Sequence, residues 1–171
     1  MLAFTRMQAV RTALKGQYHA GLAMLRATVE RFPEAAWLDV APRNPAWKVA
    51  YHVLYYTHLY LMPAEGEFEA WEGHVGDPND DLPTGIPPYT RAQVLEYVDA
   101  CDGMVDGAVD ALDLASPDSG FHWYAVPKLE HQLVNLRHLQ QHTGQLQDRL
   151  RAAADVGVRW VATARPGGSR R

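Results

Sequence analysis

The sequence contains a single cysteine, Cys101, among its 171 residues. One cysteine cannot form an internal disulfide, and it excludes the cysteine clusters that structural zinc sites use. Cys101 lies within an apolar helical pattern, which is typical of a core residue and not of a nucleophile. A reducing cytoplasm is the simplest compartment for such a chain, and we expect the protein to be cytoplasmic.

Several functional signals are also missing from the chain. No stretch approaches the roughly 20 apolar residues that a membrane-spanning helix needs, and the N-terminus lacks the pattern of a signal peptide. The net charge is −4 and no basic block runs through the body of the chain. Because nucleic-acid surfaces neutralise phosphates with Lys and Arg, this composition disfavours them. The sequence has no glycine-rich phosphate loop. We therefore expect a small-molecule substrate, and neither a membrane nor a nucleic-acid partner.

The composition is that of an ordinary globular domain. Hydrophobic residues make up 47% and charged residues 21% of the chain, and this length suits one hydrophobic core. We assign residues 1–164 to a single domain and residues 165–171 to a disordered basic tail. Residues 156–164 alternate apolar side chains, which is typical of a short extended piece or a further helix.

Four segments space their apolar side chains three and four residues apart, which predicts amphipathic helices. They run from about Thr5 to Arg31, Pro45 to Met62, Thr90 to Leu114 and Pro127 to Ala154. Thr90, followed three residues later by Gln93, predicts a capping box. Residues 63–89 form a long loop rich in proline, glycine and acid. With no strong strand signal, the sequence predicts an all-α four-helix bundle.

Two of the helical segments carry distinctive surfaces. The second is apolar or aromatic nearly all round, which is typical of a central helix; the same surface suits a homodimer, although a monomer fits it equally well. The third bears a row of carboxylates that we expect to form a solvated helix face. These are Asp99, Asp102, Asp106, Asp110 and Asp113.

His138 and His142 stand four residues apart in the fourth segment, and therefore share one helical face. Helical HxxxH pairs bind metal ions, but hydrogen bonds with Asn135 or Gln145 would also satisfy buried imidazoles. His131 lies on the same stripe, roughly 10 Å from His138 by the helical rise, which is too far for the same ion. We expect His131 to face the mouth of a pocket and keep it as a catalytic candidate.

A third nitrogen would come from the second segment. His52 and His58 lie on different helical stripes there, so only one of them can join the pair. Three histidines would leave coordination positions open, as in catalytic zinc sites. Tyr56, one turn after His52, is a candidate to orient a bound ligand. We interpret the remaining histidines as surface or packing residues; they are His19, His74 and His122.

The motif His138-Leu139-Gln140-Gln141-His142-Thr143-Gly144-Gln145-Leu146, together with Trp47 and His52, resembles the DinB/YfiT-like family of four-helix-bundle metalloenzymes. This family is not the DNA polymerase of similar name. The resemblance covers roughly Met7 to Leu150. It implies up-down-down-up connectivity with one long crossover, and a divalent metal held by His52, His138 and His142. His52 is preferred to His58 because Val53-Leu54 after it matches the family better.

On this resemblance we expect a metal-dependent enzyme in which Zn²⁺ or Ni²⁺ activates water or a thiol. Relatives with known activity are thiol-dependent S-transferases that use bacillithiol or mycothiol, and some hydrolases or isomerases. The implied cofactor is therefore a low-molecular-weight thiol, and the implied substrates are small stress-related molecules. Two alternatives stay open. One is a non-catalytic stress-response protein that binds metal or a small molecule, and the other is a histidine site that only stabilises the fold.

Overall fold

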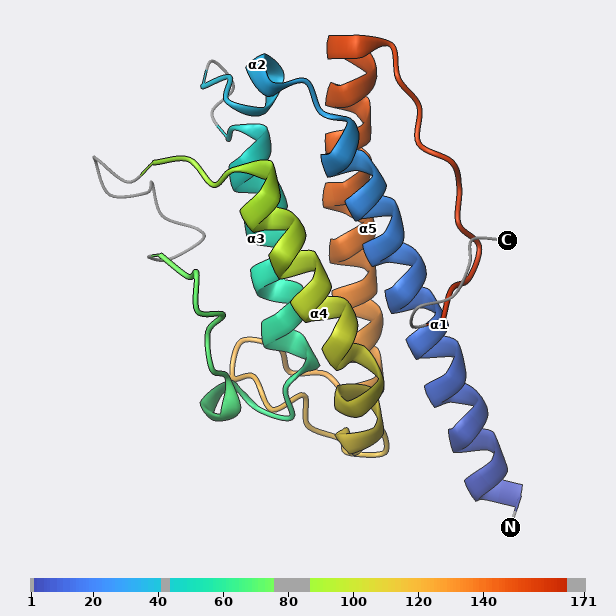
Figure 1. Cartoon of the computed structure of the whole chain (residues 1–171). Coiled ribbons are helices and arrows are strands. Elements are labelled where there is room, and N and C mark those ends of the chain that lie inside the picture. The colour runs from blue at the N-terminus through green and yellow to red at the C-terminus, as the bar shows by residue number, and fades with distance from the viewer. Residues whose placement is uncertain (1, 41–43, 76–86, 166–171) are drawn as a thin grey trace.

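The computed structural model describes residues 2–40, 44–75 and 87–165, and all regular structure in these ranges is helical. Figure 1 shows the four long helices: α1 (Leu2–Arg31), α3 (Ala46–Leu61), α4 (Arg91–Ala111) and α5 (Lys128–Ala154). Two short elements lie in the connections, α2 (Glu34–Trp37) and the 3₁₀ helix η1 (Glu65–Glu67). The predicted helical bundle is confirmed, and α2 is an addition to the prediction.

The helix boundaries follow local capping chemistry. The Thr90 side chain accepts a hydrogen bond from the backbone N–H of Gln93, and the Gln93 side chain accepts one from the backbone N–H of Thr90, which completes the predicted capping box. Pro45 and Pro127 precede their helices in an extended conformation instead of opening them. Asp155 ends α5 with a left-handed φ of 54°.

Contacts between helix ends fix the directions of the helices. Arg91 at the start of α4 bonds Glu34, just beyond the end of α1, and Arg11 near the start of α1 donates to the Leu112 carbonyl at the end of α4. Lys128 at the start of α5 donates to the carbonyl of Pro63, just after α3. The chain therefore rises through α1, descends through α3 and α4, and rises through α5 (Figure 1).

Helix α3 is the most extensively buried of the long helices. It packs against both α4 and α5, and 13 of its 16 residues are buried, as its apolar sequence predicts. The three exceptions are His52, Tyr55 and Tyr56. These three half-buried residues mark the face of α3 that its neighbours cover least. None of the described helices is both long and apolar enough to cross a bilayer.

The acidic face of α4 is exposed to solvent and is also paired with α1. The buried His19 ring contacts Asp102 through Nδ1 at 2.6 Å and Asp106 through Nε2 at 3.2 Å. Two more pairs lie along the same seam, Lys15–Asp110 and Arg26–Asp99. The sequence alone did not predict this seam of ion pairs between α1 and α4, because the cations belong to a different helix from the carboxylates.

The segment after α5 forms no further helix and runs back along α1. The backbone N–H of Ala164 donates to the carbonyl of Gly16 at 3.2 Å, and the Gln17 side chain donates to the carbonyl of Ala162 at 3.0 Å. Of the two alternatives for residues 156–164, the structure therefore has the extended piece. Residues 166–171 of the predicted tail lie outside the described residues.

Candidate metal centre

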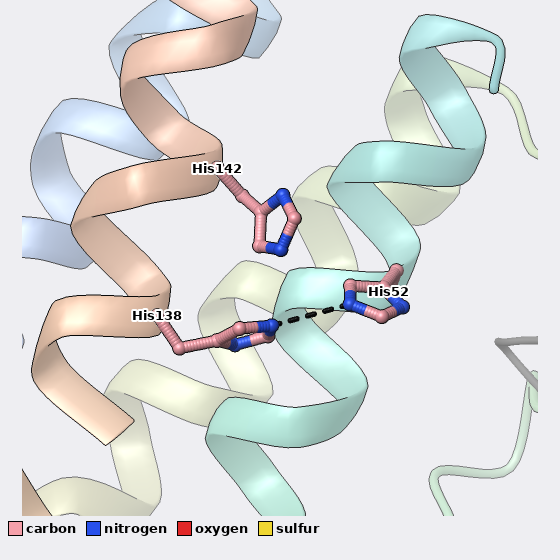
Figure 2. A group of neighbouring side chains, drawn as sticks. All are labelled: His52, His138 and His142. Carbon is pink, nitrogen blue, oxygen red and sulfur yellow. Dashed lines mark hydrogen bonds between the residues drawn. The ribbon is translucent and has the colours of Figure 1, made fainter. Parts of the chain in front are cut away.

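Three histidines from two helices converge on one point. His52 projects from α3, and His138 and His142 project from α5 (Figure 2). One ligand nitrogen of each lies within 4.8 Å of the other two, and the Nε2 atoms of His52 and His138 are 3.2 Å apart. Within the described parts of the chain, this is the one cluster of three or more His, Cys, Asp or Glu side chains that meets this distance limit.

His58, the other candidate on α3, lies elsewhere. Its ring is buried, its Nδ1 atom is 3.2 Å from the hydroxyl of Tyr97, and it packs edge-on against Phe68. Burial lowers the pKa of His58. Of the two alternatives that the sequence left open, the structure brings His52, and not His58, to the pair on α5.

The environment of His138 favours the neutral form of its ring. Burial, followed by the neighbouring His142 and His52 rings, lowers the pKa of His138 to about 3. His138 is therefore neutral at pH 7, which is the form that ligates metals. Its Nδ1 atom is buried and has no hydrogen-bond partner among the described residues.

Gln145 sets the tautomer of His142. The side-chain oxygen of Gln145 lies 2.8 Å from Nδ1 of His142. Because an amide oxygen only accepts hydrogen bonds, Nδ1 carries a proton, and Nε2 is the nitrogen left to face a metal ion. Outer-shell contacts of this kind orient histidine ligands in metal sites. Gln145, three residues after the HxxxH pair, thus has a physical role beside the ligands.

The donor set fits a divalent metal ion. Zinc–nitrogen bonds of about 2.0–2.1 Å in tetrahedral geometry place ligand nitrogens roughly 3.3 Å apart. The 3.2 Å separation between His52 and His138 agrees with that value. Three imidazole nitrogens suit several divalent transition metals, including Zn²⁺ and Ni²⁺, and they leave a coordination position for an exchangeable ligand.

A cavity of about 620 Å³ opens beside the cluster, and His52 and His138 form part of its wall. Tyr56 also lines it, with its ring centroid 4.9 Å from that of His52 and 5.6 Å from that of His138. The rest of the wall comes from α3, from the segment around η1 and from the loop before α5. These residues are Tyr55, Leu59, Tyr60, Glu65, Phe68, Trp123 and Tyr124.

His131 does not face the mouth of the cavity, contrary to expectation. Its ring is fully buried, with centroids of Tyr60, Phe121 and Tyr124 at 4.7–5.1 Å. Burial, followed by the charge of Lys128, lowers the pKa of His131 to about 4. The loop that precedes α5 folds over this part of the helix, which the spacing along α5 could not reveal.

The other histidines lie outside the cluster. His74 contacts the hydroxyl of Tyr51, and the exposed His122 lies 3.0 Å from a carboxylate oxygen of Glu65. Trp123 and Tyr124 line the cavity from the loop before α5. The run of aromatic residues in that loop was the available signal, and only tertiary packing turns it toward α3.

The fold and the site define a helical-bundle protein with a three-histidine cluster suited to a metal ion. The DinB superfamily model matches residues 17–146, a range that includes all three histidines. The chain belongs to the DinB superfamily. No curated protein and no solved structure was found to match it significantly.

Proposed function

We propose that the protein is a divalent-metal-dependent enzyme acting on small, stress-related molecules, with Zn²⁺ or Ni²⁺ held by His52, His138 and His142. The observation that carries the proposal is the convergence of these three imidazoles beside a cavity of about 620 Å³. A closed structural site would have four protein ligands and no adjoining space. The three-ligand set next to a cavity therefore favours a reactive centre over a purely stabilising one.

A bound divalent ion would lower the pKa of a coordinated water or thiol and so supply a nucleophile near neutral pH. The chain offers no thiol of its own for this purpose. Its single cysteine, Cys101, is fully buried, its Sγ lies 3.8 Å from the carbonyl oxygen of Leu54, and burial raises the pKa of its thiol. We therefore propose that the nucleophile is water or a low-molecular-weight thiol cosubstrate, which makes the reaction a hydrolysis or an S-transfer.

The surrounding side chains have distinct roles in this proposal. Gln145 holds His142 in the tautomer that directs Nε2 to the ion. Tyr56 stands over His52 and His138 and is the residue we assign to orienting the substrate by a hydrogen bond from its hydroxyl. His131, buried behind Tyr60 and Tyr124, is assigned no contact with the reacting atoms.

The metal content of the untagged protein tests the site. Wild type is expected to carry close to one equivalent of metal, and the His138→Ala/His142→Ala double variant almost none, by plasma mass spectrometry. His122→Ala removes an exposed histidine outside the cluster and serves as the matched control. Equal metal content in wild type and the double variant would contradict the proposal.

Turnover separates the enzyme from the second candidate, a non-catalytic metal- or small-molecule-binding protein of the stress response, which the aromatic cavity also suits. The assay follows loss of an electrophilic acceptor with water alone and with an added thiol. Metal-dependent turnover that chelation abolishes supports the enzyme. Saturable binding with no turnover under either condition supports the second candidate.

A further inference from the structure

The wall of the cavity beside the histidines is aromatic and almost free of charge. Phe68, Trp123 and four tyrosines contribute their rings to it. The rings contact one another, with centroids 5.4 Å apart for Tyr55–Tyr56, 5.3 Å for Tyr56–Tyr60 and 5.6 Å for Tyr60–Tyr124. Such a continuous aromatic surface suits a flat apolar group through stacked and edge-to-face contacts.

The charged groups near this wall are already engaged. Glu65 is the one charged side chain among the described lining residues, and its carboxylate lies 3.0 Å from Nδ1 of His122. No Lys or Arg is among these lining residues. Lys128, at the start of α5, is buried beneath the loop that precedes this helix. Its Nζ donates there to the carbonyl oxygens of Pro63 and Ser119. An anionic ligand would therefore enter without a cationic side chain in the wall to compensate its lost hydration.

We propose that this cavity binds an uncharged aromatic compound, with its reactive atom toward His52 and His138 and its rings between the tyrosines and Trp123. The inference deepens the proposed function and rests on it for the reactive end of the substrate. The cavity volume of about 620 Å³ falls within the roughly 300–1,000 Å³ of small-molecule sites. An organic cation is disfavoured because the ion at the histidines would repel it.

Three probes of similar shape and different charge test the proposal by isothermal titration calorimetry. They are 2-(methylsulfonyl)naphthalene, naphthalene-2-sulfonate and the naphthalen-2-yltrimethylammonium ion. The full chain is titrated both metal-free and zinc-loaded. We expect the neutral sulfone to bind at least tenfold more tightly than the sulfonate in the metal-free protein, and at least tenfold more tightly than the ammonium ion in the zinc-loaded protein. Equal or tighter binding of the sulfonate to the metal-free protein, equal or tighter binding of the ammonium ion to the zinc-loaded protein, or no measurable binding of the sulfone would overturn the proposal.

Two variants locate the binding and test the role of charge. Trp123 is 42% exposed and lines the cavity, whereas Trp160 is 68% exposed and is not a lining residue. Trp123→Ala should weaken sulfone binding at least threefold and Trp160→Ala should leave it unchanged. Glu65→Lys supplies the missing cation and should bring the affinity for the sulfonate within threefold of that for the sulfone. No effect of Trp123→Ala, or of Glu65→Lys, would overturn the assignment.

The metal-free titration keeps this inference separate from the proposed function. Failure of the metal site would appear as low metal content in a protein whose metal-free form still bound the sulfone more tightly than the sulfonate. Failure of the aromatic-ligand inference would appear as no preference for the sulfone over the sulfonate in the metal-free protein, whatever its metal content had been before chelation.

Discussion

Gln145 lies one turn after His142 on α5, and its side-chain oxygen is 2.8 Å from Nδ1 of His142. Replacing this acceptor should therefore weaken metal binding without unfolding the helix. We expect Gln145→Ala to lower zinc affinity about 10- to 100-fold, measured by competition with a chromophoric chelator. Its stability should stay within about 0.5 kcal/mol of wild type because residue 145 is exposed.

Gln145→Glu retains an acceptor oxygen and should restore most of the affinity. Gln141→Ala, an exposed neighbour on the same helix, is the matched control and should leave it unchanged. If Gln145→Ala binds zinc as tightly as wild type, the hydrogen bond to His142 has no role in the site.

The buried His131 should make the protein sensitive to acid. Its pKa is lowered to about 4 in the folded protein by burial and by Lys128, against about 6.5 in the unfolded chain. Between these pH values the unfolded state binds more protons, so the stability due to neutral His131 is complete above pH 6.5 and is lost as pH falls toward 4. The loss is on the order of 3 kcal/mol at most.

Phenylalanine occupies a similar volume and cannot be protonated, so His131→Phe should lose less stability than wild type between pH 7 and pH 4.5. Urea unfolding of the metal-free protein at the two pH values gives the comparison. The same drop in both proteins would show that His131 does not contribute to the acid sensitivity.

His19 should act in the opposite direction. Burial alone would lower its pKa, but the hydrogen bonds and charges of Asp102 and Asp106 outweigh burial and raise it. The stability gained from protonated His19 is therefore present below pH 6.5 and is lost as pH rises through the folded pKa. Asp102→Asn/Asp106→Asn should destabilise the protein more at pH 6 than at pH 9.

The His19 titration, followed by NMR, should move to lower pH in the same double variant. The control is Asp113→Asn, which neutralises another of the five aspartates in the row that includes Asp102 and Asp106. An unchanged His19 titration in the double variant would remove the electrostatic explanation of the α1–α4 seam.

Gly120 holds the loop that carries Trp123 and Tyr124 in place. Its φ is 82°, and a Cβ atom there would clash with the carbonyl oxygen of Pro63. Gly120→Ala should therefore cost about 1–3 kcal/mol of folding stability, measured by urea denaturation. Gly107→Ala, in the last two turns of α4 with open space around it, should instead stabilise the protein by roughly 0.5–1 kcal/mol. If Gly120→Ala left the folding stability unchanged, the close approach of Gly120 to Pro63 would be contradicted.

The helices and the HxxxH pair could be predicted because their signals are local. The apolar spacing, the prolines and the Thr90–Gln93 capping box place each long helix within three residues of its observed ends. Residues four apart on a helix share a face whatever surrounds them, so the pairing of His138 with His142 also needed no tertiary information.

The identity of the third histidine could not be settled by pattern, because α3 is apolar nearly all round. A helix without a polar face gives no sign of which side stays open. The packing of α4 over His58, and the open side at His52, decide the matter. The burial of His131 was hidden for a different reason, because it depends on the loop before α5, which folds over the helix.

By itself, the sequence determined an all-helical chain with four long helices and a metal-type histidine pair on the last one, because helix formation and i, i+4 neighbours depend on nearby residues. Only the tertiary structure decided that His52 completes the cluster, that α1 cations meet the α4 carboxylates, and that aromatic rings from separate segments enclose one cavity. These contacts join residues far apart in the chain, and they depend on how the helices rotate and pack around a shared core.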